Sequence, residues 1–468
     1  MNRADSRPNV IVVLTDQQRW DTTGAGGNPL GLTPHFDRMA HHGTHAALAF
    51  SPQPVCAPAR AALQTGRYPT DSGVHRNGIR LPHNTTTLAT EFGDAGYATG
   101  YIGKWHLADS EPVPPGQRGG YQSWLGTNLL EFTSDAYRTI MFDHNGHAAL
   151  LPGYRSDACF DAAIRYVTEH HAEPFFLFLS LMEPHHQNEV DSYPAPTGYA
   201  ERYAGRWMPP DLATLSANGG TAHRHMGGYL GQIARVDEGL GRLHDALLSL
   251  DLSDDTIVAF TSDHGCHFRT RNEEYKRSCH DGSIRVPLAI SGPGFDSGGR
   301  IGRPVSTVDL PVTLLDAAGI APSAPTHGHS LLPLLRDAGA EFPEEALIQI
   351  SESQCGRAIR TERWMYCVAD PDADAWDDPF GERYVETELY DLRHDPYEMD
   401  NLVGLETHRD VADSLRQRLL RRLRGIGEDG ARIDRARRRP SRPQREVDPR
   451  VHRLAADPID FGGRRGRD

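Results

Sequence analysis

Four short apolar runs, each followed at once by polar residues suited to catalysis, constrain this chain most. They cover residues 9–14, 99–102, 174–181 and 256–262. Their length and composition are those of buried strands, and a fifth such run covers 286–291. Helical patterns lie between and after them, at 156–171, 229–250 and 307–318. This alternation predicts an α/β fold in which a sheet lies between helices.

The polar residues that follow the runs predict the location of a site. Asp16-Gln17 follows the first run, Lys104 and His106 follow the second, His185 follows the third, and Asp263-His264 follows the fourth. Sites in open α/β sheets form at the carboxyl ends of strands. We therefore expect these side chains to meet at one edge of the sheet.

The chain of 468 residues is longer than one core usually holds, which predicts more than one domain. We expect a catalytic domain at 1–340 and a small α+β domain at 341–429. The second contains short strands near 347–351 and 364–368 and a helix at 409–424. Residues 430–468, rich in arginine, proline and glycine, are expected to form a flexible tail or an arm.

Composition excludes several classes of protein. A net charge of −14 argues against nucleic acid as a partner. No run reaches the roughly 20 apolar residues that span a bilayer. The polar residues 1–9 lack the pattern of a secretory signal, so we expect a cytoplasmic protein. The six cysteines are scattered and predict no disulfide framework.

Cys56 is expected to lie just before the N-terminus of a helix. Residues 56–67 read CAPARAALQTGR, in which Pro58 suits a first helical turn and the alanines favour a helix. A helix N-terminus favours anions. Cys56 is therefore either a reactive group that faces an anionic substrate or a buried, inert thiol.

Lysine is almost absent from this sequence. Of 49 basic residues, only Lys104 and Lys276 are lysine. A compact ammonium and a planar guanidinium are different chemical tools. Positions that kept lysine in an arginine-rich chain are therefore candidates for functional sites.

The segment 56–67 resembles the signature of the sulfatase family, C-x-P-x-R followed by L-x-T-G-R. The matching residues are Cys56, Pro58, Arg60, Leu63, Thr65, Gly66 and Arg67. The resemblance extends over about residues 8–403 through the segments PNVI, GKWHL, PH, SDHG and ELYDL. It implies an alkaline-phosphatase-like fold, with a mixed sheet between helices. It also implies a sulfuric ester hydrolase in which a maturation enzyme oxidises Cys56 to formylglycine.

The resemblance implies a metal site at Asp16, Gln17, Cys56, Asp263 and His264. Hard oxygen donors suit Ca²⁺, with Mg²⁺ or Mn²⁺ as alternatives. Many relatives have a second aspartate where this chain has Gln17, so the site loses one negative charge.

The resemblance also implies the catalytic roles. Lys104 and Lys276 hold the sulfate oxygens, Arg60 holds the hydrated aldehyde, His185 protonates the leaving alcohol, and His106 removes a proton to release sulfate. His186, Gln187 and Asn188 extend the site toward a substrate that we expect to be a carbohydrate sulfate. The sequence contains no feature that predicts an oligomeric state.

Two other interpretations stay open. The same superfamily contains phosphonate and phosphate mono- or diesterases that use the same aldehyde. Alternatively, Cys56 stays unmodified and the fold serves as an anion-binding module. Cys266-His267 and Cys279-His280 also offer zinc ligands, although their spacing matches no compact zinc module.

Overall fold

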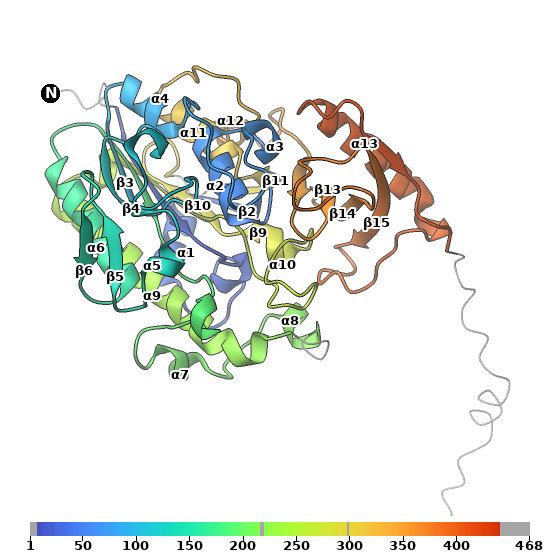
Figure 1. The fold of residues 1–468 in the computed structure, drawn as a ribbon, viewed down its shortest axis with the longest axis horizontal. Coiled ribbons are helices and arrows are strands. Elements are labelled where there is room, and N and C mark those ends of the chain that lie inside the picture. The colour runs from blue at the N-terminus through green and yellow to red at the C-terminus, as the bar shows by residue number, and fades with distance from the viewer. Residues whose placement is uncertain (1–6, 216–219, 297–298, 440–468) are drawn as a thin grey trace, which may run out of the picture.

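Two β-sheets of different size form the frame of the molecule (Figure 1). The computed structural model describes residues 7–215, 220–296 and 299–439. The large sheet has eleven strands. In order they are β11 (Gly299–Ser306), β2 (Thr44–Phe50), β10 (Leu288–Ser291), β8 (Thr256–Ser262), β1 (Asn9–Thr15), β7 (Phe175–Ser180), β3 (Ala98–Lys104), β4 (Ser123–Thr127), β5 (Thr139–Phe142) and β6 (Ala148–Leu151). The eleventh, β9 (Arg285–Val286), pairs with β2.

The five central strands β8, β1, β7, β3 and β4 run parallel. Val12 of β1 lies opposite Phe178 of β7 and Ala259 of β8. Strands β1, β7 and β8 are buried along their whole length, which explains their continuous apolar sequences. The strands predicted at 9–14, 99–102, 174–181 and 256–262 are confirmed. The run at 286–291 is divided into β9 and β10 at Pro287, which has no N–H for the ladder.

Helices cover both faces of this sheet (Figure 1). Val10, Val12 and Leu14 of β1 belong to the core formed with α2 (Cys56–Thr65), α4 (Leu88–Asp94) and α11 (Asp309–Ala317). Ile11 and Val13 point to the opposite core, formed with α1 (Pro34–His42), α6 (Arg155–Glu169) and α9 (Ala222–Ser249). The predicted helices at 156–171, 229–250 and 307–318 correspond to α6, α9 and α11. Helix α9 begins at Ala222, earlier than predicted. The sequence did not reveal its first two turns because residues 222–228 have no long apolar side chain other than Met226.

Several short helices lie in the connections. They are α3 (Pro69–Ser72), α5 (Leu130–Thr133), α7 (Tyr199–Tyr203), α8 (Pro210–Leu215), α10 (Asp281–Ile284) and α12 (Leu332–Arg336). In the part of the chain that the structure describes, no helix is both long and apolar enough to span a membrane.

The second sheet belongs to the C-terminal part of the chain. Its strands are β12 (Glu345–Ile350), β13 (Cys355–Thr361), β14 (Trp364–Asp370), β15 (Arg383–Asp391) and β16 (Arg432–Asp434). Helix α13 (Arg409–Arg424) packs on it through Leu415, Leu419 and Leu423. The predicted small α+β domain is therefore confirmed, whereas the boundary at residue 341 stays a prediction.

The structure corrects the start of the predicted arm at residue 430. Residues 432–434 form β16, which pairs in parallel with β15. Ile433 lies in the core of this sheet, and Arg383 and Asp434 form an ion pair of 2.7 Å. The sequence did not predict this strand because it is only three residues long and two of them, Arg432 and Asp434, are charged. The remainder of the predicted arm, 440–468, lies outside the described residues.

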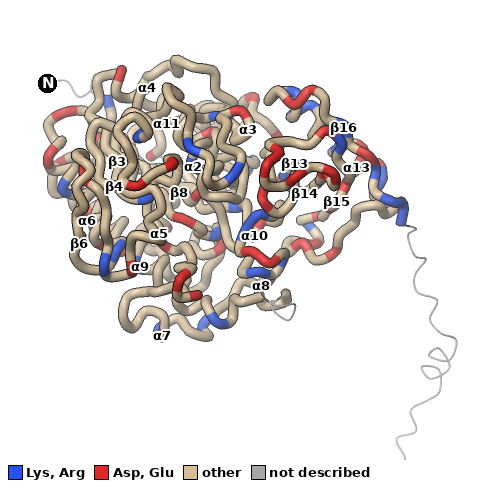
Figure 2. Tube along the Cα trace, viewed as in Figure 1, with Lys and Arg blue, Asp and Glu red and all other residues tan. Residues whose placement is uncertain are grey.

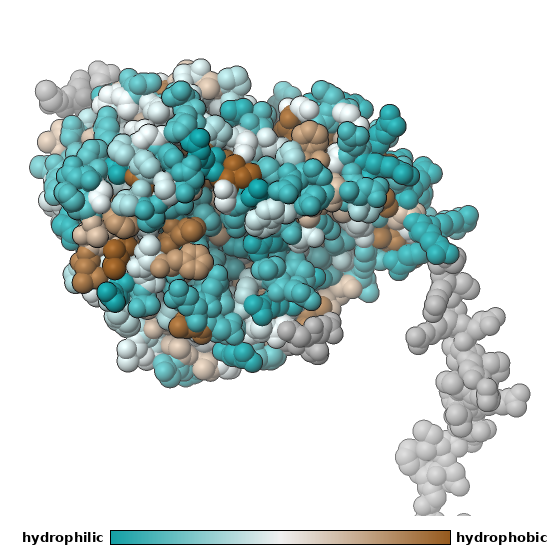
Figure 3. Space-filling view, in the orientation of Figure 1, coloured by the Kyte–Doolittle hydropathy of each residue, from teal (hydrophilic) through white to brown (hydrophobic). Residues whose placement is uncertain are grey.

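The surface carries both charge signs. Acidic and basic residues are interspersed over the trace in Figure 2. The face in Figure 3 is mostly hydrophilic, with apolar side chains gathered over α5, β5 and β6. Phe132 and Leu150, which are 56% and 65% exposed, belong to this region.

Candidate active site

The carboxyl ends of β1, β3, β7 and β8 bring the predicted polar residues together. Nζ of Lys104, at the end of β3, lies 2.8 Å from Oδ2 of Asp16, which follows β1. Nε2 of His185, beyond β7, lies 4.0 Å from Oδ1 of the same aspartate. Nε2 of His264, beyond β8, lies 3.6 Å from Oδ1 of Asp16. The edge of the parallel sheet thus carries one connected cluster of polar side chains.

Cys56 is the first residue of α2, not the residue before it. Asn77 accepts a hydrogen bond from the backbone N–H of Ala57 at 3.1 Å and so caps this helix. The Cys56 sulfur lies 2.7 Å from Nζ of Lys276 and 3.3 Å from Nε2 of His264. Position 56 therefore lies at a helix N-terminus and faces the ammonium group of Lys276 and the imidazole of His264.

The charges around Cys56 favour an anion. Burial alone would raise the pKa of the thiol, but Lys276, Lys104 and His264 hold it well below its ordinary value. An anionic group or a developing negative charge at this position is stabilised in the same way.

Four buried side chains form a potential metal site. Ligand atoms of Asp16, Cys56, Asp263 and His264 all lie within 4.8 Å of one another. Burial and the nearby Asp16 raise the pKa of Asp263, and its Oδ2 accepts no hydrogen bond. Two carboxylates and an imidazole in one buried cluster fit a divalent cation.

Gln17 adopts a backbone conformation that is unusual for a residue with a side chain, with φ of 70°. Its N–H donates to Oδ1 of Asp263 at 3.1 Å, and its Oε1 accepts from the N–H of His186 at 3.0 Å. Through these two hydrogen bonds, Gln17 links Asp263 to the loop that follows β7. Its side chain also lines the cavity beside Cys56. Its role as a metal ligand stays a prediction.

The two lysines have different surroundings. Nζ of Lys276 contacts Cys56 and lies 3.0 Å from Nε2 of His264. Lys104 is fully buried and donates to Asp16 at 2.8 Å and to Glu131 at 3.0 Å. Burial would lower the pKa of Lys104, but the two carboxylates raise it, so the ammonium stays charged.

Arg60 connects the carboxylates to the sheet. One terminal nitrogen donates to the Lys104 carbonyl and to Ser180, and the other donates to Asp16 at 3.0 Å. Its Nε lies 3.2 Å from Oδ2 of Asp263. These contacts position both acidic residues.

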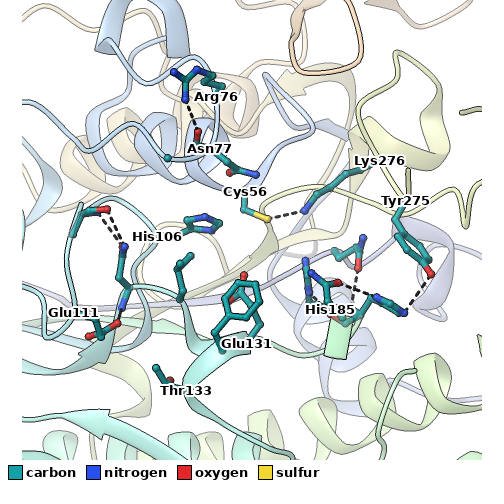
Figure 4. Close-up of a pocket in the computed structure, with 18 of the residues that line it drawn as sticks. Cys56, Arg76, Asn77, His106, Glu111, Glu131, Thr133, His185, Tyr275 and Lys276 are labelled. Atoms are coloured by element: carbon teal, nitrogen blue, oxygen red, sulfur yellow. Dashed lines mark hydrogen bonds between the residues drawn. The ribbon is translucent and has the colours of Figure 1, made fainter. Parts of the chain in front are cut away.

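The two predicted catalytic histidines flank position 56 in the cavity (Figure 4). Nδ1 of His185 lies 2.6 Å from the carbonyl oxygen of His186, which can only accept a hydrogen bond. Nε2 of His185 is therefore the nitrogen left to face Asp16. His106 lies on the other side of Cys56 and has a φ of 60°, in the left-handed region.

A cavity of about 750 Å³ opens over position 56. Its lining includes Gln17, His106, His185 and Lys276, together with residues that the sequence did not indicate: Arg76, Asn77, Glu131, Tyr275 and Trp376. Glu131 holds Lys104, and Asn77 caps α2. Both come from connections without a motif, so no local pattern could have identified them.

The predicted extension of the site is confirmed only in part. His186 and Asn188 line the cavity, whereas Gln187 is buried and donates to the Glu131 carbonyl. Cys266 and Tyr193 lie side by side, with 3.6 Å between sulfur and hydroxyl oxygen. Cys279 and His280 contact Glu388 of the C-terminal domain instead. The two Cys-His pairs therefore do not form one zinc site.

The site thus combines a buried cluster of potential metal ligands with Lys276 beside position 56, an arrangement that suits an anionic ester. A profile of the sulfatase family matches residues 8–320, which are most of the chain. A second profile, described as the C-terminal part of N-sulphoglucosamine sulphohydrolase, matches residues 274–424. The chain belongs to the sulfatase family and is an enzyme that hydrolyses sulfate esters.

Curated relatives cover most of this chain. An ulvan-active sulfatase of Formosa agariphila is 29% identical over 446 residues, which are 91% of this chain and 82% of the relative. An N-acetylglucosamine-6-O-sulfatase of Bacteroides thetaiotaomicron is 24% identical, covering 85% of this chain and 83% of the relative.

Solved structures agree with the fold. A putative sulfatase of Bacteroides fragilis has a TM-score of 0.77 at 25% identity, covering 92% of this chain and 98% of that one. A phosphonate monoester hydrolase of Agrobacterium radiobacter has a TM-score of 0.65 at 23% identity, covering 90% and 96%. The second likeness concerns the fold alone.

Proposed function

We propose that this sulfatase hydrolyses a carbohydrate sulfate ester through a hydrated formylglycine derived from Cys56. The observation that carries the proposal is the placement of position 56. It lies at the start of α2, between Lys276, His264 and Asp16 and at the floor of the cavity. The Cys56 sulfur stands in for the oxygen atoms that the modified side chain would place there. A maturation enzyme that oxidises Cys56 is the partner that this mechanism requires.

The reaction proceeds in two steps. One hydroxyl of the hydrated aldehyde gives its proton to Asp263 and attacks sulfur, and the bond between sulfur and the alcohol oxygen breaks as His185 protonates that oxygen. His106 then removes the proton of the second hydroxyl, so that sulfate leaves and the aldehyde returns. A serine in the same place would form a sulfate ester without a second hydroxyl to release it.

The remaining residues stabilise charge and geometry. Lys276 neutralises the sulfuryl oxygens next to position 56, and Lys104 acts from the buried side beside Asp16. Arg60, through its hydrogen bonds to Asp16 and its contact with Asp263, positions the carboxylates. A divalent cation held by Asp16, Asp263, His264, position 56 and Gln17 would supply Lewis-acid charge when bound. We propose Ca²⁺, because oxygen donors dominate, and His264 leaves Mn²⁺ and Mg²⁺ as alternatives.

Substrate comparison tests the reaction class. The purified, matured enzyme should release sulfate from nitrophenyl sulfate faster than phosphate or phosphonate from the corresponding nitrophenyl esters, measured as kcat/KM. A clear preference for phosphate or phosphonate esters would instead assign the chain to the esterases of the same fold.

Replacing either lysine by arginine is expected to lower kcat by about 100- to 1,000-fold, the usual effect of removing one oxyanion donor. The charge is kept, but a planar guanidinium does not reproduce the contacts that Lys276 makes with position 56. Steady-state kinetics of Lys104→Arg and Lys276→Arg give the measurement, and circular dichroism checks their folding. Near-normal kcat in both folded variants would make the two lysines incidental.

The names of the two curated relatives support a carbohydrate substrate, as does an aromatic residue at the cavity rim. Trp376, which is 46% exposed, lines the cavity from the C-terminal domain. The guanidinium of Arg76 stacks over its ring at 5.0 Å. An aromatic ring beside a cationic group suits the apolar face and the charged groups of a sugar.

Trp376→Ala is expected to raise KM for a sulfated sugar by about 2- to 10-fold, the range for losing one aromatic contact. KM for nitrophenyl sulfate should change much less, because that ester is too short to reach the rim. Phe380→Ala is the matched control, since Phe380 is similarly exposed at 48% on the same connection but does not line the cavity. Equal effects of Trp376→Ala on both substrates would remove Trp376 from the sugar site.

A further inference from the structure

A second group of potential metal ligands lies beside the active site and has no part in the proposed reaction. It consists of His186 in the loop after β7, Asp191 after the 3-10 turn Asn188–Val190, and His225 in the first turn of α9. One ligand atom from each lies within 4.8 Å of the others. Both histidines are buried, at 3% and 4% exposure.

The three potential ligands have more hydrogen-bond acceptors facing one another than protons to share among them. Nδ1 of His186 lies 3.0 Å from Oδ1 of Asn188, so this nitrogen carries the hydrogen of a neutral ring. Its Nε2 then has a lone pair that faces Oδ1 of Asp191 at 3.0 Å. The Tyr275 hydroxyl, which points toward this site in Figure 4, lies 3.3 Å from Nε2 of His186. It also lies 3.4 Å from Oδ1 of Asp191, so it has one proton for the two acceptors.

His225 adds an independent observation. Its Nε2 is buried and has no hydrogen-bond partner among the described residues. The rings of His225 and His186 lie 5.7 Å apart at 76°, so both can present nitrogens to one point. A proton on His186 would satisfy only the contact with Asp191, whereas a cation would also satisfy His225.

We propose that His186, Asp191 and His225 bind a zinc ion, or another divalent ion that prefers nitrogen and oxygen ligands. Two imidazoles and one carboxylate leave a fourth position for water, as in open zinc sites. Asn188 acts as the outer partner that fixes the tautomer of a metal-binding histidine. The Asp191 side chain is 54% exposed and provides the route of entry.

The backbone supports this assignment. Asp191 has a φ of 42°, a conformation that is costly for a non-glycine residue and that occurs at binding sites. Its side chain faces His186 in this conformation. The site shares no side-chain ligand with the Asp16 cluster, and the backbone of His186 connects the two through its hydrogen bonds with Gln17 and His185.

Zinc at this position would fix the loop that carries His185. The His186 carbonyl accepts from Nδ1 of His185 at 2.6 Å, and His186, Asn188 and Tyr275 all line the active-site cavity. The ion would therefore hold the loop that forms this wall of the cavity in one conformation. Zinc binding itself does not depend on the proposed reaction.

Zinc titration of the full chain tests the proposal. Cys56→Ala/Asp16→Asn serves as the background, because it removes two groups of the other metal site. Competition with a chromophoric chelator measures the affinity, and Co²⁺ reports the geometry by its visible absorption. We expect His225→Gln and Asp191→Asn each to lower the affinity for one zinc ion by at least about 10- to 100-fold, since even the loss of an outer hydrogen-bond partner lowers metal affinity that much. The Co²⁺ band should disappear in parallel.

Matched controls separate a metal site from general damage. Glu189→Gln changes an exposed carboxylate in the same loop, and His223→Gln changes an exposed histidine on the same helix. Both should keep the full affinity. The proposal is wrong if the background protein binds no zinc, or if Asp191→Asn, a substitution at an exposed side chain that folding tolerates, leaves every zinc affinity unchanged.

Discussion

Removal of the divalent metal is expected to lower turnover by at least about 1,000-fold, because Lewis-acid charge contributes several kcal/mol and each 1.4 kcal/mol is a factor of ten. Without it, Asp16 and Asp263 present two carboxylates to an anionic ester. Asp16→Asn is expected to reproduce the loss, since Asp16 belongs to the ligand cluster. Turnover after chelation and after readdition of Ca²⁺, Mg²⁺ or Mn²⁺ gives the measurement.

Elemental analysis provides a readout that does not depend on activity. The folded Asp16→Asn protein should lose one equivalent of metal that the parent protein retains. Asp94→Asn is the control, because Asp94 is an exposed aspartate at the end of α4. Full turnover in a chelated protein in which no metal is detected would remove the cation from the mechanism.

Replacing His185 by alanine is expected to cost about 100- to 10,000-fold on alkyl or sugar sulfates, the usual range for a general acid. An alkoxide leaving group has a high pKa and needs a proton in the transition state. Nitrophenolate leaves almost unaided, so the same variant should lose far less on nitrophenyl sulfate. The ratio of the two losses in kcat/KM is the quantity to measure.

His106→Ala separates the two histidines. It acts after the alcohol has left, so it should slow both substrates and let the sulfated enzyme accumulate, which intact-protein mass spectrometry detects. If His185→Ala loses the same factor on good and poor leaving groups while chemistry limits the rate, His185 is not the acid.

Burial explains which strands the sequence revealed. Strands β1, β7 and β8 are buried on both faces, so each has a continuous apolar run at its centre that the sequence shows clearly. Strand β2 reads THAALAF and β11 reads GRIGRPVS, and neither composition distinguishes a strand from a loop. Their place in the sheet depends on pairing with distant partners, including a register shift between Ile301 and Pro304.

The residues of the site likewise fall into those that the sequence predicted and those that only the structure revealed. Asp16, Lys104, His185 and Asp263 were predictable because each stands next to a strand end, and the signature identified Cys56. Glu131 and Asn77 contribute one contact each from connections whose sequences carry no motif. Trp376 reaches the cavity from the second domain, and only the packing of the two domains places it there.

The mass of the tryptic peptide Met39–Arg60 tests the central claim most directly, because it contains position 56 and no other cysteine. The protein should be produced together with a formylglycine-generating enzyme and its sulfatase activity measured on the same sample. We predict a peptide with an aldehyde in place of the Cys56 thiol, in a proportion that rises with specific activity. Fully active protein in which this peptide carries only unmodified cysteine would contradict the mechanism.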